Sequence, residues 1–116
     1  MTEADLAQAL RKRLYYTAPT VALVAVPNGG KRTVWAARQA KKEGMATGFP
    51  DLVCLAPGGL VAFIELKLPK ARVNENQTEW QQRLQGMDFP AAIIRSVDDG
   101  VAFLRGAGFP VREAAA

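Results

Sequence analysis

The sequence contains no histidine, and this absence removes several kinds of active site at once. Histidine is the commonest metal ligand and the usual base in Ser-His and Cys-His nucleophile systems. The single cysteine, Cys54, cannot build a four-thiolate metal site either. Any catalysis by this chain must therefore depend on carboxylates and lysine.

Long apolar runs and disulfide-forming cysteines are also missing. One cysteine cannot form a disulfide within the chain, and the N-terminus lacks the basic and apolar segment of a secretion signal. The longest apolar run, around residues 60–64, is far shorter than the ~20 residues that a membrane-spanning helix requires. We therefore expect a soluble protein of the reducing cytoplasm, with no membrane partner.

The chain has 116 residues, of which 49% are hydrophobic and 22% charged, a composition typical of one folded domain. This length predicts a single domain over residues 1–116 with room for one active site. Charge is unevenly distributed: residues 1–42 contain eight Lys or Arg against two acids, and the remainder contains seven against nine. The basic excess therefore lies in the N-terminal third.

Helix and strand signals alternate along the chain. Four-residue apolar spacing, candidate N-caps and Gly or Pro at the breaks predict an α-β-α-β-β-α-β-α order. The strands on either side of Pro57-Gly58-Gly59 form a hairpin, and both are apolar on both faces, which is typical of central strands covered by helices. We expect an α/β fold with a mixed sheet of about four strands. The expected helices cover 3–16, 33–43, 75–87 and a segment from 97, and the expected strands cover 21–26, 51–56, 60–67 and 91–95.

Three ionisable residues, Asp51, Glu65 and Lys67, interrupt the apolar pattern of the hairpin. If the hairpin is centred on Gly58, residues 51 and 65 face each other and residue 67 shares their side of the sheet. Opposed carboxylates repel each other unless one is protonated or a cation lies between them. Oxygen ligands suit Mg²⁺ or Mn²⁺, so the pattern predicts a divalent metal site. Alternatively, Asp51 is a turn residue and Glu65 pairs with Lys67 at a solvated strand end.

Four motif blocks in this order resemble a known nuclease family. Gly48-Phe49-Pro50-Asp51 is followed, after thirteen residues, by Glu65-Leu66-Lys67, with Pro27-Asn28-Gly29 upstream and Asn76-Gln77 downstream. The arrangement resembles the PD-(D/E)XK nucleases, in particular the virus-type replication-repair nuclease (VRR-NUC) branch, from residue 3 to about residue 104. The resemblance implies a restriction-endonuclease-like core and a metal-dependent endonuclease that hydrolyses DNA phosphodiester bonds.

The resemblance also assigns roles to the motif residues. It implies that Asp51 and Glu65 bind the metal, that the Leu66 carbonyl completes the protein ligands, and that Lys67 orients the attacking water and offsets developing charge. A bound Mg²⁺ or Mn²⁺ can lower the pKa of a water and polarise the phosphate. Such chemistry needs no histidine, which agrees with the composition.

Two further candidates each have a structural alternative. Glu3 shares a helical stripe with Leu6 and Leu10, and related nucleases place a first-helix Glu at the metal site; alternatively, Glu3 is an exposed acid that favours a helix N-terminus. Gln77 borders the active site in the family; alternatively, it forms a capping box with Asn74. For Gln77 the two roles are compatible.

The basic segment that ends at Lys42 contains no acid and is a candidate DNA-binding surface. Its candidate contacts are Asn28, Lys31, Arg32, Arg38, Lys41 and Lys42. The alternatives are a turn at Asn28 and a solvated helix face for the basic residues. We expect Trp35 and Trp80 to lie in the core rather than to stack on bases, and Cys54 to be a buried strand residue.

The resemblance extends to substrate and assembly. Stand-alone members of the family are thought to be homodimers that cut branched DNA such as Holliday junctions, which would fit a phage or prophage gene for replication or recombination. The alternatives are a non-catalytic DNA-binding module and a general or restriction-like nuclease. Candidate dimer contacts are the turn beginning at Pro19, Met45 and the segment Gly108-Phe109-Pro110-Val111; alternatively, Phe109 and Val111 form an edge strand.

Overall fold

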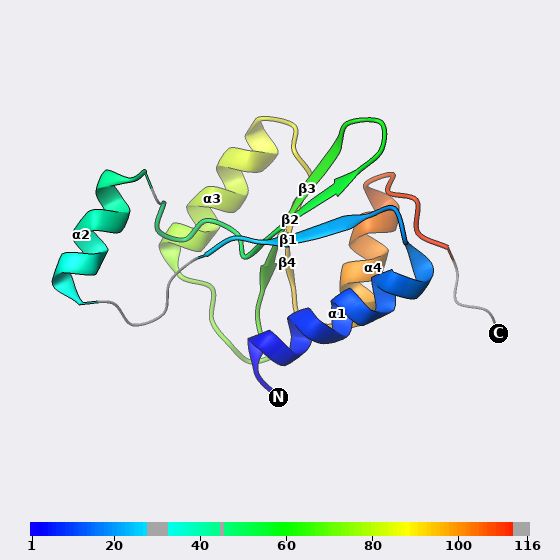
Figure 1. Ribbon diagram of the computed structural model, residues 1–116, viewed down its shortest axis with the longest axis horizontal. Helices are drawn as coiled ribbons and strands as arrows, with labels where there is room; N and C mark the ends of the chain where they lie inside the picture. The colour runs from blue at the N-terminus through cyan, green and yellow to red at the C-terminus, as the bar shows by residue number, and fades with distance from the viewer. Residues whose placement is uncertain (28–32, 45, 113–116) are drawn as a thin grey trace.

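The computed structural model describes residues 1–27, 33–44 and 46–112. Within these ranges four helices and four strands alternate in the order expected from the sequence (Figure 1). The elements are α1 (Glu3–Thr17), β1 (Ala22–Ala25), α2 (Val34–Lys42), β2 (Leu52–Ala56), β3 (Leu60–Leu66), α3 (Glu75–Gly86), β4 (Ala91–Ile94) and α4 (Val97–Gly106). No helix within the same ranges has the length and apolar character needed to cross a membrane.

The strands form one mixed sheet in the order β1-β2-β3-β4. β2 pairs antiparallel with both β1 and β3, whereas β3 and β4 pair in parallel and are joined through α3. In the hairpin, Leu52 pairs with Ile64 and Ala56 with Leu60, so the register is centred on Gly58 as expected. The parallel pair brings the carboxyl ends of β3 and β4 to the same edge of the sheet.

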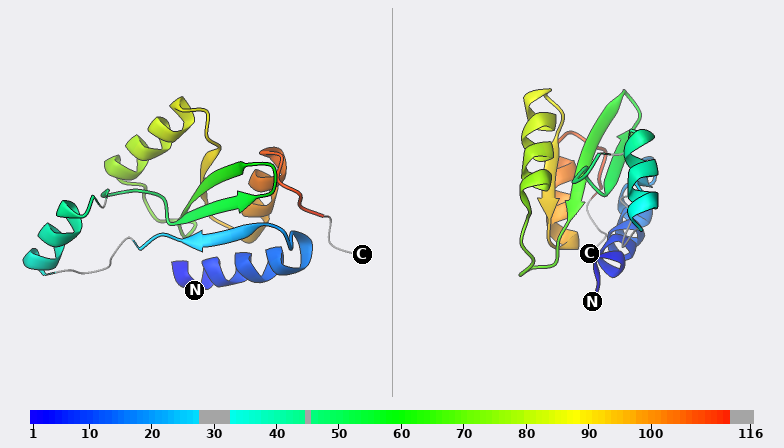
Figure 2. Two further views of the ribbon diagram at one scale, coloured as in Figure 1. Left: turned by 45° about the horizontal axis from the view of Figure 1, so that its top comes forward. Right: turned by 90° about the vertical axis from the view of Figure 1, so that its left-hand side faces the viewer.

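Helices cover both faces of the sheet. α1 and α4 pack on one face, where Leu10, Ile64 and Leu104 are fully buried in the main core. Cys54 is also fully buried there, as expected, and burial raises the pKa of its thiol to about 12. α3 packs on the opposite face over a smaller core cluster that includes Phe63 (Figure 2).

Two expectations about the core are wrong. The sequence predicts that helices cover both faces of β2, but Leu55 on β2 is 41% exposed. The reason is that α3 packs over β4, at the other edge of the sheet from β1. The sequence also predicts a buried Trp35, but this side chain is 71% exposed. α2 lies beyond the end of the sheet (Figure 2), and Ala40 is the buried residue of this helix. Trp80 packs against the smaller core cluster, as expected.

The segment after α4 folds back into the core. The sequence predicts either a dimer contact or an edge strand for this segment, and both expectations are wrong for Phe109. Gly108 has a φ of +87°, and the N–H groups of Gly108 and Phe109 donate to the carbonyl oxygens of Arg105 and Leu104 at 3.1 and 3.0 Å. These two bonds form a Schellman motif. Phe109 is 4% exposed in the main core, lies in no strand and has Val111 packed beside it. Phe109 is therefore neither a free interface residue nor part of an edge strand.

The substitution Phe109→Ala should lower the free energy of unfolding by about 3–5 kcal/mol, the usual cost of emptying a buried aromatic site. Phe89→Ala is the matched control and should cost less, because Phe89 is 37% exposed. Urea denaturation measures both changes. A small loss of stability at Phe109, accompanied by a change in oligomeric state, would contradict its placement in the core of its own chain.

Candidate active site

The segment that precedes β2 docks on α3 and so fixes the position of Asp51. Gly48 has a φ of +83°, and a Cβ atom there would lie 2.6 Å from the backbone of Asn76, so this close approach requires glycine. Phe49 packs edge-to-face against two rings of the smaller core cluster, with centroid distances of 5.7 and 5.0 Å. Pro50 is fully buried. Gly48, Phe49 and Pro50, which precede Asp51 in its motif, therefore each have a structural role.

Asp51 is tied to the strands on both of its sides. Its carbonyl oxygen accepts a hydrogen bond from the N–H of Val26 at 2.8 Å, and its Oδ2 accepts one from the N–H of Leu66 at 2.8 Å. Continuation of the hairpin register places residue 51 opposite Glu65, on the face that α3 covers. The backbone thus holds one oxygen of this carboxylate in place and directs it toward β3.

Glu65 is 3% exposed, and one of its oxygens is held by α3. Nε2 of Gln77 donates to Oε1 of Glu65 at 2.7 Å. Oε1 of Gln77 accepts from the N–H of Asn74 at 3.1 Å, and the Asn74 side chain accepts from the N–H of Gln77 at 2.9 Å, which completes a capping box. Gln77 therefore caps α3 and orients Glu65 with the same amide.

Burial and neighbouring charges favour the protonated form of Glu65. Burial, followed by repulsion from Asp51, raises the pKa of Glu65 from 4.5 to about 8, with further increases from a hydrogen bond shared with Asp51 and from Glu3. Lys67 acts in the opposite direction. The buried Oε2 of Glu65 accepts from no donor group of the described residues, because Asp51 can share a hydrogen bond with Glu65 only through a carboxyl proton. A bound cation would relieve both the repulsion and the unpaired oxygen.

The structure brings the acidic candidates and Lys67 together, since Glu3 and Lys67 both shift the pKa of Glu65, and it keeps the basic candidates of α2 apart from them. Glu3 is exposed at the start of α1 yet raises the pKa of Glu65, so it lies within electrostatic range of the carboxylate pair. Arg38, Lys41 and Lys42 are exposed on α2, at the end of the molecule beyond the sheet (Figure 1). The remaining candidates Asn28, Lys31 and Arg32 lie outside the described residues.

Gln81 is a polar residue of this region that no sequence motif marks. It lies one turn after Gln77 on α3, is 6% exposed, and has a buried Nε2 without a partner in the described part of the chain. Gln81 follows Gln77 by four residues, a spacing that places both amides on one helix face. This spacing is the sequence signal that could have marked Gln81 as a residue of the site. The face of α3 that covers Glu65 is therefore more polar than its apolar pattern indicates.

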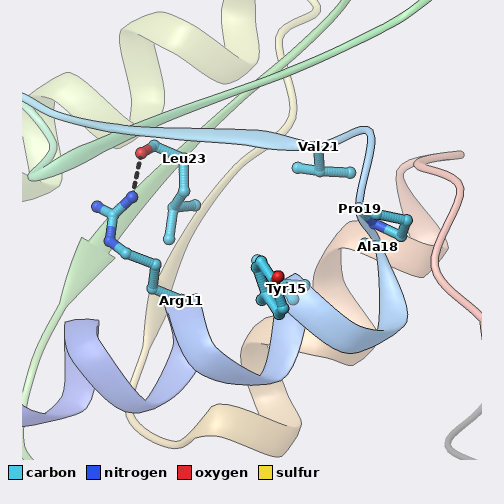
Figure 3. A pocket seen from close by; sticks show the side chains of 7 residues that line it. Arg11, Tyr15, Ala18, Pro19, Val21 and Leu23 are labelled. Carbon is cyan, nitrogen blue, oxygen red and sulfur yellow. Dashed lines mark hydrogen bonds between the residues drawn. The ribbon is translucent and has the colours of Figure 1, made fainter.

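A cleft of about 390 Å³ lies between α1 and β1, and none of the predicted catalytic residues lines it. Nη1 of Arg11 reaches from α1 to the carbonyl oxygen of Leu23 at 2.7 Å (Figure 3). Because β1 is an edge strand, this contact satisfies an acceptor on the open edge of the sheet. The lining residues are Arg11, Leu14, Tyr15, Ala18, Pro19, Val21 and Leu23. The cleft is thus separate from the carboxylate pair.

The raised pKa of Glu65 predicts how the stability of the metal-free protein depends on pH. Between pH 4.5 and about 8 the folded state keeps a proton on Glu65 that the unfolded state releases. The free energy of unfolding should therefore fall as pH rises through this range, by at most about 1.4 kcal/mol per pH unit. Urea denaturation with a chelator, compared with Glu65→Gln at each pH, isolates this contribution. A constant difference between the two proteins would contradict the assignment.

Comparison with known proteins identifies the family of this chain. The model of the VRR-NUC domain matches residues 2–98, a range that contains both carboxylates and α3. A solved structure named "VRR_NUC domain protein" has a TM-score of 0.68 and 17% sequence identity, with coverage of 92% of this chain and 88% of that chain, which shows a shared fold. No curated protein matches the chain at a significant level. The chain therefore belongs to the VRR-NUC family of nuclease domains.

Proposed function

We propose that this chain is a metal-dependent endonuclease that hydrolyses phosphodiester bonds in DNA, with residues 1–116 acting as one nuclease domain. The observation that carries the proposal is the opposed pair of Asp51 and Glu65, in which a buried oxygen of Glu65 has no donor among the described residues. Two carboxylates alone would repel a phosphate. With a divalent cation between them, the same pair would attract it.

The residues of the pair fit Mg²⁺ or Mn²⁺. Mg²⁺ is commonly held by one or two carboxylates together with waters and a phosphate. Asp51 and Glu65 would supply the carboxylates, and the Leu66 carbonyl would supply a third protein ligand. The described ranges contain no cluster of three His, Cys, Asp or Glu side chains, so backbone, water and substrate would complete the site. The ion would lower the pKa of a water and polarise the phosphate.

The residues around the pair would orient the ligands and balance charge. The N–H of Leu66 holds one oxygen of Asp51 and Gln77 holds one oxygen of Glu65, so each carboxylate has a second oxygen for the metal. Lys67 follows β3 on the same side of the sheet, where its ammonium would orient the attacking water and stabilise the negative charge that develops on the phosphate. Glu3 would contribute through a water.

The cations of α2 would bind the DNA backbone. Arg38, Lys41 and Lys42 are exposed, and none of them forms an ion pair within the described part of the chain. Free cations on a projecting helix suit phosphates that lie outside the catalytic centre. We extend this surface to Asn28, Lys31 and Arg32, which precede α2 in the sequence.

We propose branched DNA, such as a Holliday junction, as the preferred substrate and a homodimer as the active form. Resolution of a four-way junction needs two nearly symmetric nicks, and a two-fold dimer supplies two sites in that arrangement. The turn at Pro19 is exposed and remains a candidate contact, whereas Met45 lies outside the described residues. A single cysteine fits the reducing cytoplasm of a bacterial or phage-infected cell.

A panel of four-way junction, nicked and linear DNAs, incubated with purified protein and Mg²⁺, tests this function. Paired incision of the junction by a protein that is dimeric in light scattering is the expected result. Equal cutting of all the DNAs would indicate a general nuclease. Binding without cutting would indicate a non-catalytic module and would contradict the proposal.

Asp51→Asn and Glu65→Gln should each reduce cleavage by at least about 10²-fold, the scale of a lost oxyanion contact, while DNA binding is kept. Removal of a negative charge beside the phosphate should, if anything, strengthen binding. Asp88→Asn is the matched control, since Asp88 is exposed and its φ of 68° suits Asn. Cleavage above a tenth of the parent rate in either variant would remove that residue from the metal site.

Reversal of two charges, Lys41→Glu with Lys42→Glu, should weaken DNA binding and flatten its salt dependence. Each phosphate contact contributes roughly 0.9 to the slope of log affinity against log salt concentration, so the slope should fall by up to about 1.8. Lys12→Glu with Arg105→Glu makes the same charge change on α1 and α4 and serves as the control. Equal slopes for the two double variants would show that α2 is a solvated helix that does not contact DNA phosphates.

A further inference from the structure

Arg95 joins the end of β4 to the loop that leaves β3. Its Nη1 donates to the carbonyl oxygens of Leu68, Pro69 and Ala71 at 2.8, 3.2 and 2.8 Å. The N–H of Lys67 donates to the carbonyl oxygen of Ile94 at 3.0 Å, immediately before Arg95, so the two strand ends are also joined by their backbones. One guanidinium therefore gathers three acceptors of a segment that has no strand or helix of its own. We call residues 67–73 the β3–α3 loop.

The backbone of the β3–α3 loop is held inward, whereas its basic side chains face solvent. The N–H of Ala71 donates to the carbonyl oxygen of Leu68 at 3.0 Å, which closes a turn, and Pro69 has a fixed φ. Lys70 and Arg72 are exposed and form no ion pair with any described residue. Arg95 pairs three carbonyl groups of the loop, while Lys70 and Arg72 remain exposed to solvent.

The β3–α3 loop lies between two residues of the carboxylate site. It begins at Lys67, directly after β3, and leads to α3 (Figure 1), whose Gln77 holds Glu65. Lys70 follows Lys67 by three residues, so their Cα atoms lie within about 11 Å of each other. A phosphate next to one at the carboxylate pair would therefore lie within reach of this loop. The cations of α2 are on a separate element and do not duplicate this position.

We propose that the β3–α3 loop is a preformed phosphate-binding element for the DNA strand at the carboxylate site, and that Arg95 is the positioning residue that fixes its shape. The inference rests on the proposed function, because it takes DNA as the ligand. Lys70 and Arg72 would contact phosphates directly. Arg95 would not touch DNA and would act through the three carbonyl groups that it holds.

The contacts of Lys70 and Arg72 are tested by DNA binding in the Asp51→Asn background, so that no DNA is cut. A labelled four-way junction is titrated at several salt concentrations with a chelator present. Lys70→Gln with Arg72→Gln should lower the salt slope by about 1.8, because two contacts are lost. Lys12→Gln with Arg105→Gln is the control of equal charge and should keep the parent slope. Equal slopes for the two double variants would overturn the proposal.

The role of Arg95 is tested by limited digestion with trypsin, which can cut after Lys70 and after Arg72. Arg95→Ala should speed cutting at these two bonds at least about tenfold, with products identified by mass spectrometry. Arg95→Lys, whose ammonium cannot reproduce the planar guanidinium, should show an intermediate rate; it replaces the alanine variant if that protein is unfolded by circular dichroism. An unchanged cutting rate in a folded variant would show that Arg95 does not fix the loop.

Combination of the variants separates positioning by Arg95 from direct contact. In the background of Lys70→Gln with Arg72→Gln, Arg95→Ala should leave the salt slope unchanged, because the contacts that it positions are already gone. A further fall of about 0.9 would mean that Arg95 itself binds a phosphate and would overturn its positioning role. Neither binding nor digestion requires cleavage. A protein that fails to cut DNA but shows the expected slopes would refute the nuclease proposal and leave this inference standing.

Discussion

The candidate site depends on a single electrostatic constraint: two carboxylates are held together against their mutual repulsion by a β-hairpin. Asp51 and Glu65 are opposed because the register of β2 and β3 is centred on Gly58. Their surroundings do not remove the repulsion, since Leu66 and Gln77 each bind one oxygen through an uncharged donor. Strand pairing and the main core beneath it supply the opposing free energy. Burial, followed by this repulsion, raises the pKa of Glu65.

Features that depend on short-range sequence patterns were predicted well. The order of elements, the hairpin register and the capping box at Asn74 all follow from residue spacings of two to four, which backbone geometry fixes locally. Opposition of residues 51 and 65 needs only a turn centre and the two-residue period of a strand. The core of the candidate site was therefore accessible from sequence, because one hairpin carries both carboxylates.

Features that depend on where an element packs were predicted poorly. The composition of α2 favours a helix but does not say that this helix lies beyond the sheet, so Trp35 was misplaced. Phe109 was misplaced although Gly108 followed by an apolar residue is a recognised signal for a helix end that folds back. Arg95 was missed for a different reason. Its partners are backbone carbonyl groups, which every residue has, so no residue type marks them.

The capping box of α3 also restricts which amino acids position 77 can hold. Glu and Gln both suit this place in a capping box, because either accepts from the N-cap N–H. α1 uses an acid at the same place, where Asp5 accepts from the N–H of Thr2 at 2.8 Å. At position 77 the side chain must in addition donate to Glu65, which an ionised carboxylate cannot do. Helix initiation alone would tolerate an acid at position 77, whereas the hydrogen bond to Glu65 requires an amide that donates.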